Sequence, residues 1–286
     1  MSRRARVLLA VGAVGVVVAG AAILASHTQS TVARCGAGLV ELGARCCGSG
    51  QRLEGSACVG EPTDCGPTLS LSHDGCVAPP RVVFFAAGEL DLAPLDWEAA
   101  GLVTPRHVHV DAFRLDAFEV TRERWEGCVL ARQCLAIDPS TPREPGLPVV
   151  NVSADAAALF CAYAGGKLPS SDQLLFAAAG PTAHRYPWGE TGAVCRRAAF
   201  GMVTGPCATG AVGPDLAGSR PDGASPEGVF DLAGNAAEWA LGPSGVPEAR
   251  GGSFSDSAAA SLRAWDRRAL PDGAAARDIG LRCAYE

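Results

Sequence analysis

The distribution of cysteine constrains the fold of this 286-residue chain more than any other feature. The twelve cysteines fall into two groups of equal size. One group is crowded into a short Gly-rich segment, and the other is spread through the remainder of the chain. An even number of cysteines in each group is typical of disulfides in an exported protein. The first group is Cys35, Cys46, Cys47, Cys58, Cys65 and Cys76, and the second is Cys128, Cys134, Cys161, Cys195, Cys207 and Cys283.

Zinc is the alternative ligand for the first group of cysteines. That group has no Cys-x-x-Cys pair and only His73 nearby, which is a poor match to structural zinc sites. We therefore expect disulfides to hold residues 34–78 together as a cysteine-rich module, because the segment has too few apolar residues for a core. The spacing does not select the pairing. Pro79 and Pro80 mark the boundary with a larger domain, residues 79–286.

The start of the chain predicts a membrane anchor. Residues 7–25 carry no charged side chain and follow three arginines, and their length is near the roughly 20 residues of a membrane-spanning helix. We expect residues 1–25 to be a signal anchor whose arginines stay in the cytoplasm, followed by a polar linker at 26–33. Cleavage after Ala25 is the alternative. Both interpretations place the rest of the chain outside the cytoplasm, in the periplasm or at the cell surface.

Charge and composition limit the classes of partner. The formal net charge is -6, and no cluster of Lys and Arg in the exported part forms a basic face, so nucleic acid is not an expected partner. The chain has a single lysine, Lys167, against many arginines. That bias indicates a GC-rich genome and a bacterial source.

The larger domain shows signals for both strands and helices. Residues 81–85 read as a strand, and residues 107–121 alternate well enough for one or two more. Beyond Gly180 the chain is expected to be dominated by loops. This pattern predicts an α+β fold with little regular secondary structure. Three helices are expected behind Ser or Thr caps, from Thr121 to about Ala131, from Ser153 to Ala164, and from Ser170, with Gln173 completing a capping box, to about Ala179.

Seven short blocks resemble those of the formylglycine-generating enzyme family, also called the sulfatase-modifying factor family. The likeness extends from about Arg81 to Glu286, and the blocks occur in the family's order. It implies a compact α+β fold of the formylglycine-generating-enzyme type, which is C-type lectin-like, with bound calcium. The blocks are FEVT at 118–121, LPVVNVS at 147–153, GGKLPS at 165–170, YPWGE at 186–190, GVFDLAGNAAEW at 228–239, RGGSF at 250–254 and GLRCA at 280–284.

The resemblance also implies pairings in the second group of cysteines. It pairs the cysteine before GGKLPS with the one in GLRCA, here Cys161 with Cys283. A bridge between Cys128 and Cys134 then requires the first helix to end near Ala131 and turn back, because a continuous helix holds them too far apart. The third pair is Cys195 with Cys207.

A calcium site is implied at GNAAEW. In the family this block binds one ion through Asn and Glu side chains and nearby main-chain oxygens, which carries over to Asn235, Ala236 and Glu238. Calcium takes such neutral and anionic oxygen ligands. The alternative is that Glu238 and Trp239 close a turn against the core.

Copper is not expected. Family members that make formylglycine place two cysteines shortly after RGGS, where they bind copper(I). The corresponding stretch here, residues 255–261, has no cysteine. Copper(I) selects thiolate sulfur over hydroxyl and carboxylate oxygen. Formylglycine generation is therefore not expected of this chain.

One further pair of residues could hold a metal. His107 and His109 are alternate residues of an expected strand and project to the same side. With no carboxylate at hand in the sequence, the two imidazoles make an incomplete metal site.

These observations predict an extracytoplasmic, membrane-anchored, non-catalytic module that binds a peptide, protein or glycan of the cell envelope. The alternative is a divergent metal-dependent oxidoreductase of the same family that acts on protein or peptide. Loops held by a rigid scaffold commonly build such binding sites. The residues expected to line the groove are Trp188, Arg250, Ser253, Asp256, Trp265 and Arg267.

Overall fold

A computed structural model describes most of the larger domain and parts of the cysteine-rich module. The anchor and linker predicted for residues 1–33 lie outside the described residues, as do Cys35 and Cys65. No helix in the described part of the chain is long and apolar enough to span a bilayer. The described residues are 39–42, 45–54, 57–60, 70–72, 75–77, 81–93, 103–137, 144–271 and 273–286.

The described part of the cysteine-rich module consists of three antiparallel hairpins with similar register. In each hairpin a cysteine is the second residue of the second strand, namely Cys46, Cys58 and Cys76. This repetition of register was not apparent from composition alone. The hairpins are β1 (Leu39–Leu42) with β2 (Arg45–Gly48), β3 (Arg52–Glu54) with β4 (Ala57–Val59), and β5 (Ser70–Ser72) with β6 (Gly75–Val77).

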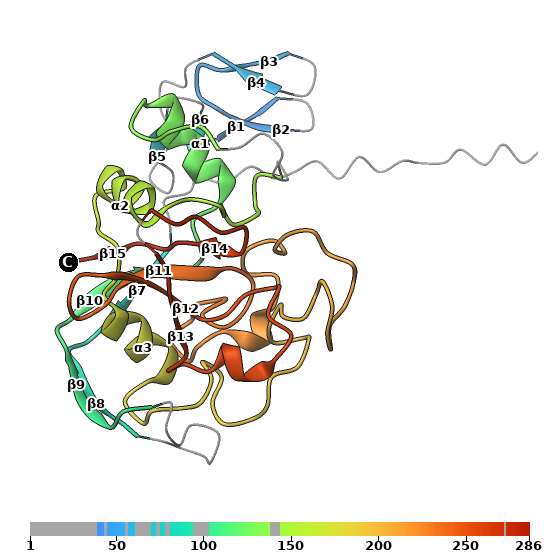
Figure 1. Ribbon diagram of the computed structural model, residues 1–286. Coiled ribbons are helices and arrows are strands. Elements are labelled where there is room, and N and C mark those ends of the chain that lie inside the picture. Colours follow the sequence, from blue (N-terminus) through green and yellow to red (C-terminus); the bar gives the residue numbers. More distant parts are fainter. Residues whose placement is uncertain are drawn as a thin grey trace, which may run out of the picture.

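The larger domain is organised around a four-stranded sheet with the order β13-β12-β11-β14 (Figure 1). Loops dominate the chain after Gly180, as expected, and this sheet adds four short strands that the sequence did not predict. Its strands are short, and the first four residues of β11 are all buried, so the sequence lacks the alternation by which a half-buried strand is found. The strands are β11 (Ala237–Leu241), β12 (Pro247–Arg250), β13 (Arg267–Ala269) and β14 (Ile279–Gly280).

A second sheet joins the beginning of the domain to its end. The order is β15-β10-β7, so the C-terminal strand β15 (Ala284–Tyr285) pairs with β10 (Phe113–Asp116), which also pairs with β7 (Val82–Phe85). The separate hairpin of β8 (Gly88–Leu92) and β9 (Arg106–Val110) lies beside it in sequence. The predicted strands at 81–85 and within 107–121 are thus confirmed, whereas β8 was not predicted.

The three predicted helices are confirmed together with their caps. They are α1 (Arg122–Leu130), α2 (Ala154–Tyr163) and α3 (Ser171–Ala179). The N-cap hydroxyls of Thr121, Ser153 and Ser170 each accept a backbone N–H in the first turn, which satisfies a donor that the helix leaves unpaired. Gln173 completes the capping box by accepting the N–H of Ser170 at 2.8 Å. Helix α3 packs against β9, β11 and β12.

Three disulfides tie the loops of the larger domain together. They are Cys128–Cys134, Cys161–Cys283 and Cys195–Cys207. Helix α1 ends at Leu130, and Arg132 adopts a φ of 59°, which turns the chain so that the Cα atoms of Cys128 and Cys134 lie 5.3 Å apart. The pairings implied by the resemblance are therefore present. They are consistent with an oxidising, extracytoplasmic environment.

Candidate functional site in a mixed-charge cavity

A small cavity lies beside the central sheet and collects charged side chains of both signs. Its volume is about 140 Å³. Strands β11, β12 and β13 form one wall, and the loop between β12 and β13 forms the rest. Its lining residues are Ala237, Ala249, Arg250, Gly252, Asp256, Ser261, Asp266 and Arg268.

Arg250, the last residue of β12, is held rigidly in the wall of the cavity. It is buried, its Nε donates to Ser171 Oγ and to Glu248 Oε1, and its Nη1 donates to the carbonyl of Ala264 at 3.2 Å. Burial raises the pKa of Glu248, but the hydrogen bond from Ser171 and the charges of Arg250 and Arg267 outweigh it and lower the pKa overall. Glu248 is therefore a fixed anion that positions the arginine.

Two consecutive glycines shape the floor of the cavity. Gly251 and Gly252 have φ values of 89° and 65°, which favour glycine. A Cβ on Gly252 would also lie 2.5 Å from the carbonyl oxygen of Ser261. The close approach carries the chain beneath the short helix that ends near Ser261. The two glycines of the RGGS block thus allow the course of the backbone, and the arginine and serine of the block supply side-chain contacts at the cavity.

Asp256 is oriented by a hydrogen-bond network around Ser253. The backbone N–H and the hydroxyl of Ser253 both donate to Asp256 Oδ2 at 2.8 Å. The same hydroxyl lies 3.0 Å from Asp278 Oδ2, which also accepts from Arg268 Nη1 at 3.0 Å. One oxygen of Asp256 is therefore occupied by Ser253, and Asp278 holds Arg268 in place.

Asp266 is the titratable carboxyl of the cavity. Burial, followed by the negative charge of Asp256, raises the pKa of Asp266 to about 6. Across the cavity, Nη2 of Arg268 is buried and has no hydrogen-bond partner among the described residues. The cavity therefore contains a carboxyl that exchanges its proton near neutrality and a guanidinium nitrogen that is left without an acceptor.

The structure brings together part of the predicted groove. Arg250 and Asp256 line the cavity, and Ser253 is buried next to it. Arg267 does not line it, because its side chain is exposed and pairs with Glu248 Oε2 at 3.0 Å. Two residues lie in other packing environments. Trp265 is buried in the core under the guanidinium of Arg263, and Trp188 stacks on Tyr186 with a centroid distance of 5.1 Å.

Three polar lining residues were absent from the predicted groove, namely Ser261, Asp266 and Arg268. The alternation of β13 is the signal that could have found Arg268, since Arg267 and Ala269 are exposed on either side of it. Ser261 and Asp266 enter the cavity through loop geometry, for which the sequence carries no periodic signal.

The residues of the predicted calcium site are bonded within the protein. Both oxygens of Glu238 accept from Arg282, at 2.5 and 2.7 Å. Asn235 Oδ1 accepts the N–H of Asp215, its Nδ2 donates to Glu119 at 2.8 Å, and the N–H of Ala236 donates to the other oxygen of Glu119. The cation beside Glu238 is thus a guanidinium, and these side chains do not fit calcium in this arrangement.

Glu119 is the centre of this buried polar network, and its role was not predicted from the sequence. Burial raises the pKa of Glu119 well above its ordinary value, and the charges of Asp231 and Glu238 raise it further. Glu119, Glu238 and Arg282 all lie in the interior. The network connects the FEVT, GNAAEW and GLRCA blocks, so its clearest role is structural.

Carboxylates from the neighbouring strand β8 lie opposite His107 and His109, although the sequence around the two histidines did not reveal them. The pairing of β8 with β9 places Glu89 opposite His109 and Asp91 opposite His107. His107 Nδ1 lies 2.8 Å from Asp91 Oδ1, and this hydrogen bond raises the pKa of the His107 imidazole. No three His, Cys, Asp or Glu side chains within the described ranges are arranged to hold a metal ion. The two histidines and the facing carboxylates form an exposed group of ion pairs across β8 and β9.

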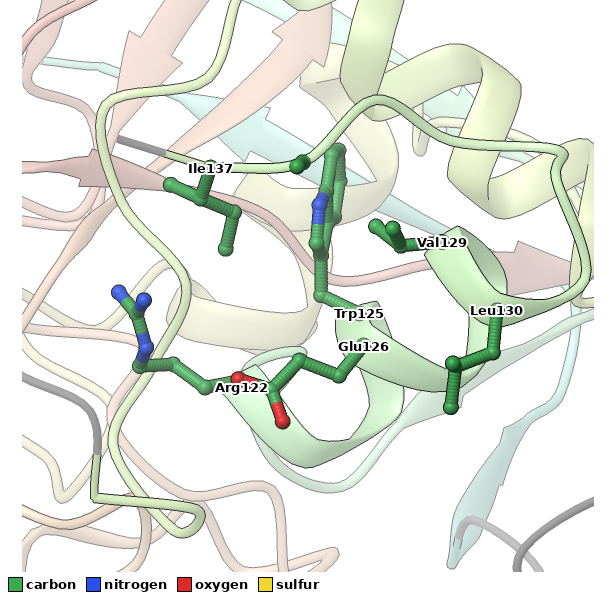
Figure 2. A pocket seen from close by; sticks show the side chains of 7 residues that line it. Arg122, Trp125, Glu126, Val129, Leu130 and Ile137 are labelled. Atoms are coloured by element: carbon green, nitrogen blue, oxygen red, sulfur yellow. The ribbon is translucent and has the colours of Figure 1, made fainter. Parts of the chain in front are cut away.

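A separate, more apolar hollow of about 500 Å³ lies on helix α1 (Figure 2). Figure 2 shows the Trp125 ring between Val129 on the helix and Ile137 on the returning chain. The indole N–H of Trp125 donates to the carbonyl of Leu135 at 3.0 Å. The Cys128–Cys134 bridge closes the turn that brings this returning chain back. The hollow has fewer charged groups than the cavity beside the sheet.

A profile of the sulfatase-modifying factor enzyme 1-like domain matches residues 70–286, which is most of the chain. The chain belongs to this sulfatase-modifying factor family. A relative from Mus musculus, inactive C-alpha-formylglycine-generating enzyme 2, is 33% identical over 153 residues. That alignment covers 48% of this chain and 49% of the mouse protein, so the chain spans about half the length of this relative.

Solved structures show the same fold at low sequence identity. PvdO from Pseudomonas aeruginosa has a TM-score of 0.61 at 19% identity and covers 72% of this chain and 94% of its own. Treponema denticola variable protein 1 has a TM-score of 0.57 at 18% identity, covering 71% and 94%. CarF has a TM-score of 0.53 at 19% identity, covering 72% and 98%. At this identity the likeness concerns the fold alone.

Proposed function

We propose that this sulfatase-modifying factor protein is a non-catalytic binding module of the cell envelope that holds a peptide or glycan in the mixed-charge cavity. We further propose that it is bacterial and extracytoplasmic, with residues 1–25 as its membrane anchor, and that its domain is related to the C-type lectin fold. The disulfides of the larger domain support the location. Calcium has no part in the proposal, because its predicted ligands are bonded within the protein.

The observation that carries the proposal is the chemistry of the cavity wall. Asp256 and Ser261, which belong to the segment where related enzymes place their copper-binding cysteines, both line the cavity. Their oxygen atoms are poor ligands for copper(I). The second group of cysteines cannot replace them, because all six are consumed in disulfides. The similarity to a mouse protein described as inactive agrees with this interpretation.

The test compares the full chain with a variant in which both thiols are restored. The wild-type chain and the double variant Asp256→Cys, Ser261→Cys are purified and analysed for copper and iron, then incubated with copper, oxygen and a cysteine-containing peptide. We expect no stoichiometric metal and no peptide oxidation for the wild type, and copper binding by the variant alone. Oxidation of the peptide by the wild-type chain would overturn the proposal and favour the oxidoreductase alternative.

A further inference from the structure

The two guanidinium groups of the cavity differ in how their hydrogen bonds are satisfied. Arg250 is bonded to Ser171, Glu248 and Ala264. Within the described residues the Arg268 side chain bonds to Asp278 alone, and its Nη2 is shielded from solvent although the side chain as a whole is partly exposed. A buried charged donor without an acceptor is costly. The Arg268 side chain also lines the cavity, where an anionic oxygen of a ligand would meet its positive charge.

The opposite charge is available within the same cavity. Asp266 is half-buried, and within the described residues no other side chain forms a hydrogen bond with its carboxyl. Asp256 accepts from Ser253 through Oδ2, which leaves its Oδ1 available for a ligand. Ser261 adds a hydroxyl to the lining. The wall therefore offers two cations, two carboxyls and one hydroxyl within a volume well below the roughly 300 Å³ at which drug-sized pockets begin.

We propose that this cavity binds the zwitterionic head of an α-amino acid, either free or exposed at the end of a peptide branch. Arg268 takes the carboxylate through its guanidinium group, and the Asp256 and Asp266 carboxyls take the ammonium group. The inference rests on the proposed function, which makes this cavity the binding site.

Ligands of a single charge fit the cavity less well. An isolated carboxylate would meet the negative charge of Asp256 and Asp266, and an isolated ammonium group would leave the Arg268 guanidinium without an anion from the ligand. Charges that are arranged in complement to those of the ligand give specificity through the penalty on wrong partners. A head that carries both charges satisfies both sides of the wall, and its small size suits the small volume.

The test is a calorimetric titration of the full chain with four small probes. Alanine and γ-glutamylglycine both carry a free α-amino-acid head, and the second carries it at the end of a peptide. N-acetylalanine lacks the ammonium group, and alaninamide lacks the carboxylate. We expect the first two to bind and the two blocked compounds to bind at least about tenfold more weakly, the effect of one lost charged contact.

Variants locate the binding to the cavity. Arg268→Lys keeps the positive charge but removes Nη2, and Asp266→Asn removes the negative charge, so each should weaken binding by about tenfold or more. Arg267→Lys, on the exposed side of the same strand, is the control and should bind as the wild type does. Equal binding of N-acetylalanine and alanine would overturn the inference, as would wild-type affinity in Arg268→Lys.

Failure of this inference can be separated from failure of the proposed function. If only γ-glutamylglycine binds, the head is recognised on a peptide, and if alanine binds equally well the free amino acid suffices. If none of the four probes binds, the zwitterion inference is overturned. The proposed function is overturned separately, by peptide oxidation in the wild-type chain.

Discussion

Removal of the Arg282 guanidinium tests whether the buried network holds the domain together. Arg282 is fully buried and donates two hydrogen bonds to Glu238 and one each to the carbonyls of Asp116 and Phe230. Replacement by Met keeps an unbranched apolar stem but leaves the Glu238 charge without its partner. Breaking a buried pair in this way typically costs about 3–5 kcal/mol.

The expected loss for Arg282→Met is therefore about 3–5 kcal/mol in the free energy of unfolding, measured by urea denaturation with tryptophan fluorescence. For a domain of this size that corresponds to a decrease in Tm of roughly 6–20 °C. Arg196→Met is the control, because Arg196 and its partner Asp222 are exposed, and it should cost about 0–1 kcal/mol. The double variant Glu238→Gln, Arg282→Met should recover part of the loss.

The pH dependence of the same variant provides a second readout. Burial raises the pKa of Glu238 even with Arg282 present, and removal of the cation raises it further. The folded variant then takes up a proton more readily than the unfolded chain, so its deficit relative to the wild type should shrink as the pH falls. A deficit below about 1 kcal/mol at neutral pH would refute the reasoning, because it would mean that the unpaired carboxylate is not costly.

Three further predictions concern the disulfides, a glycine and the cavity. Replacement of both Cys161 and Cys283 by Ser should cost roughly 5 kcal/mol, since the bridge closes a loop of 122 residues, and thermal unfolding of the variant against the wild type measures it. Gly223→Ala should cost roughly 3 kcal/mol in a urea titration, because the new Cβ would lie 1.8 Å from the carbonyl oxygen of Arg197. Gly192→Ala is the control, because no atom lies within 4 Å of its new Cβ, and it should be neutral or slightly stabilising. Burial and the charge of Asp256 raise the pKa of Asp266 to about 6, although Arg250 and Arg263 offset part of the shift. Asp266→Asn should therefore stabilise the fold by roughly 1 kcal/mol at neutral pH, after allowance for the partial solvation of the carboxyl. The Asp266 carboxyl contributes most to stability below its unfolded pKa near 4, and that contribution is lost as the pH rises to about 6. The stabilisation by Asp266→Asn should therefore vanish at acidic pH. Equal stabilisation at all pH values would contradict a raised pKa for Asp266.

Local chemistry made the helices predictable, whereas the disulfide pairings followed from the family resemblance. A hydroxyl at Thr121, Ser153 or Ser170 satisfies a donor within three residues, so the start of each helix is encoded next to it. The central sheet was not predictable, because β11 is buried along most of its length and shows no alternation. The burial of Glu119 also could not be foreseen, since its partners Asn235 and Ala236 lie over a hundred residues away in the chain.

The candidate site was predictable to the extent that it follows from the RGGS block. Arg250, the first residue of the block, and Asp256, three residues after it, line the same cavity, as their closeness in the sequence suggests. Trp265 was expected beside them, but the side chain is drawn into the core, where an indole removes more apolar surface from water than at a polar wall. Ser261 and Asp266 depend on how a loop folds back, which residue spacing does not specify.

The last strands of the chain impose an order on its maturation. β14 joins the central sheet, β15 joins the second sheet, and Cys283 between them forms the long-range disulfide. The two sheets are complete only once residues 279–285 are in place. A chain truncated before Ile279 would lack β14, β15 and the disulfide together, and proteases would meet it as an open polypeptide.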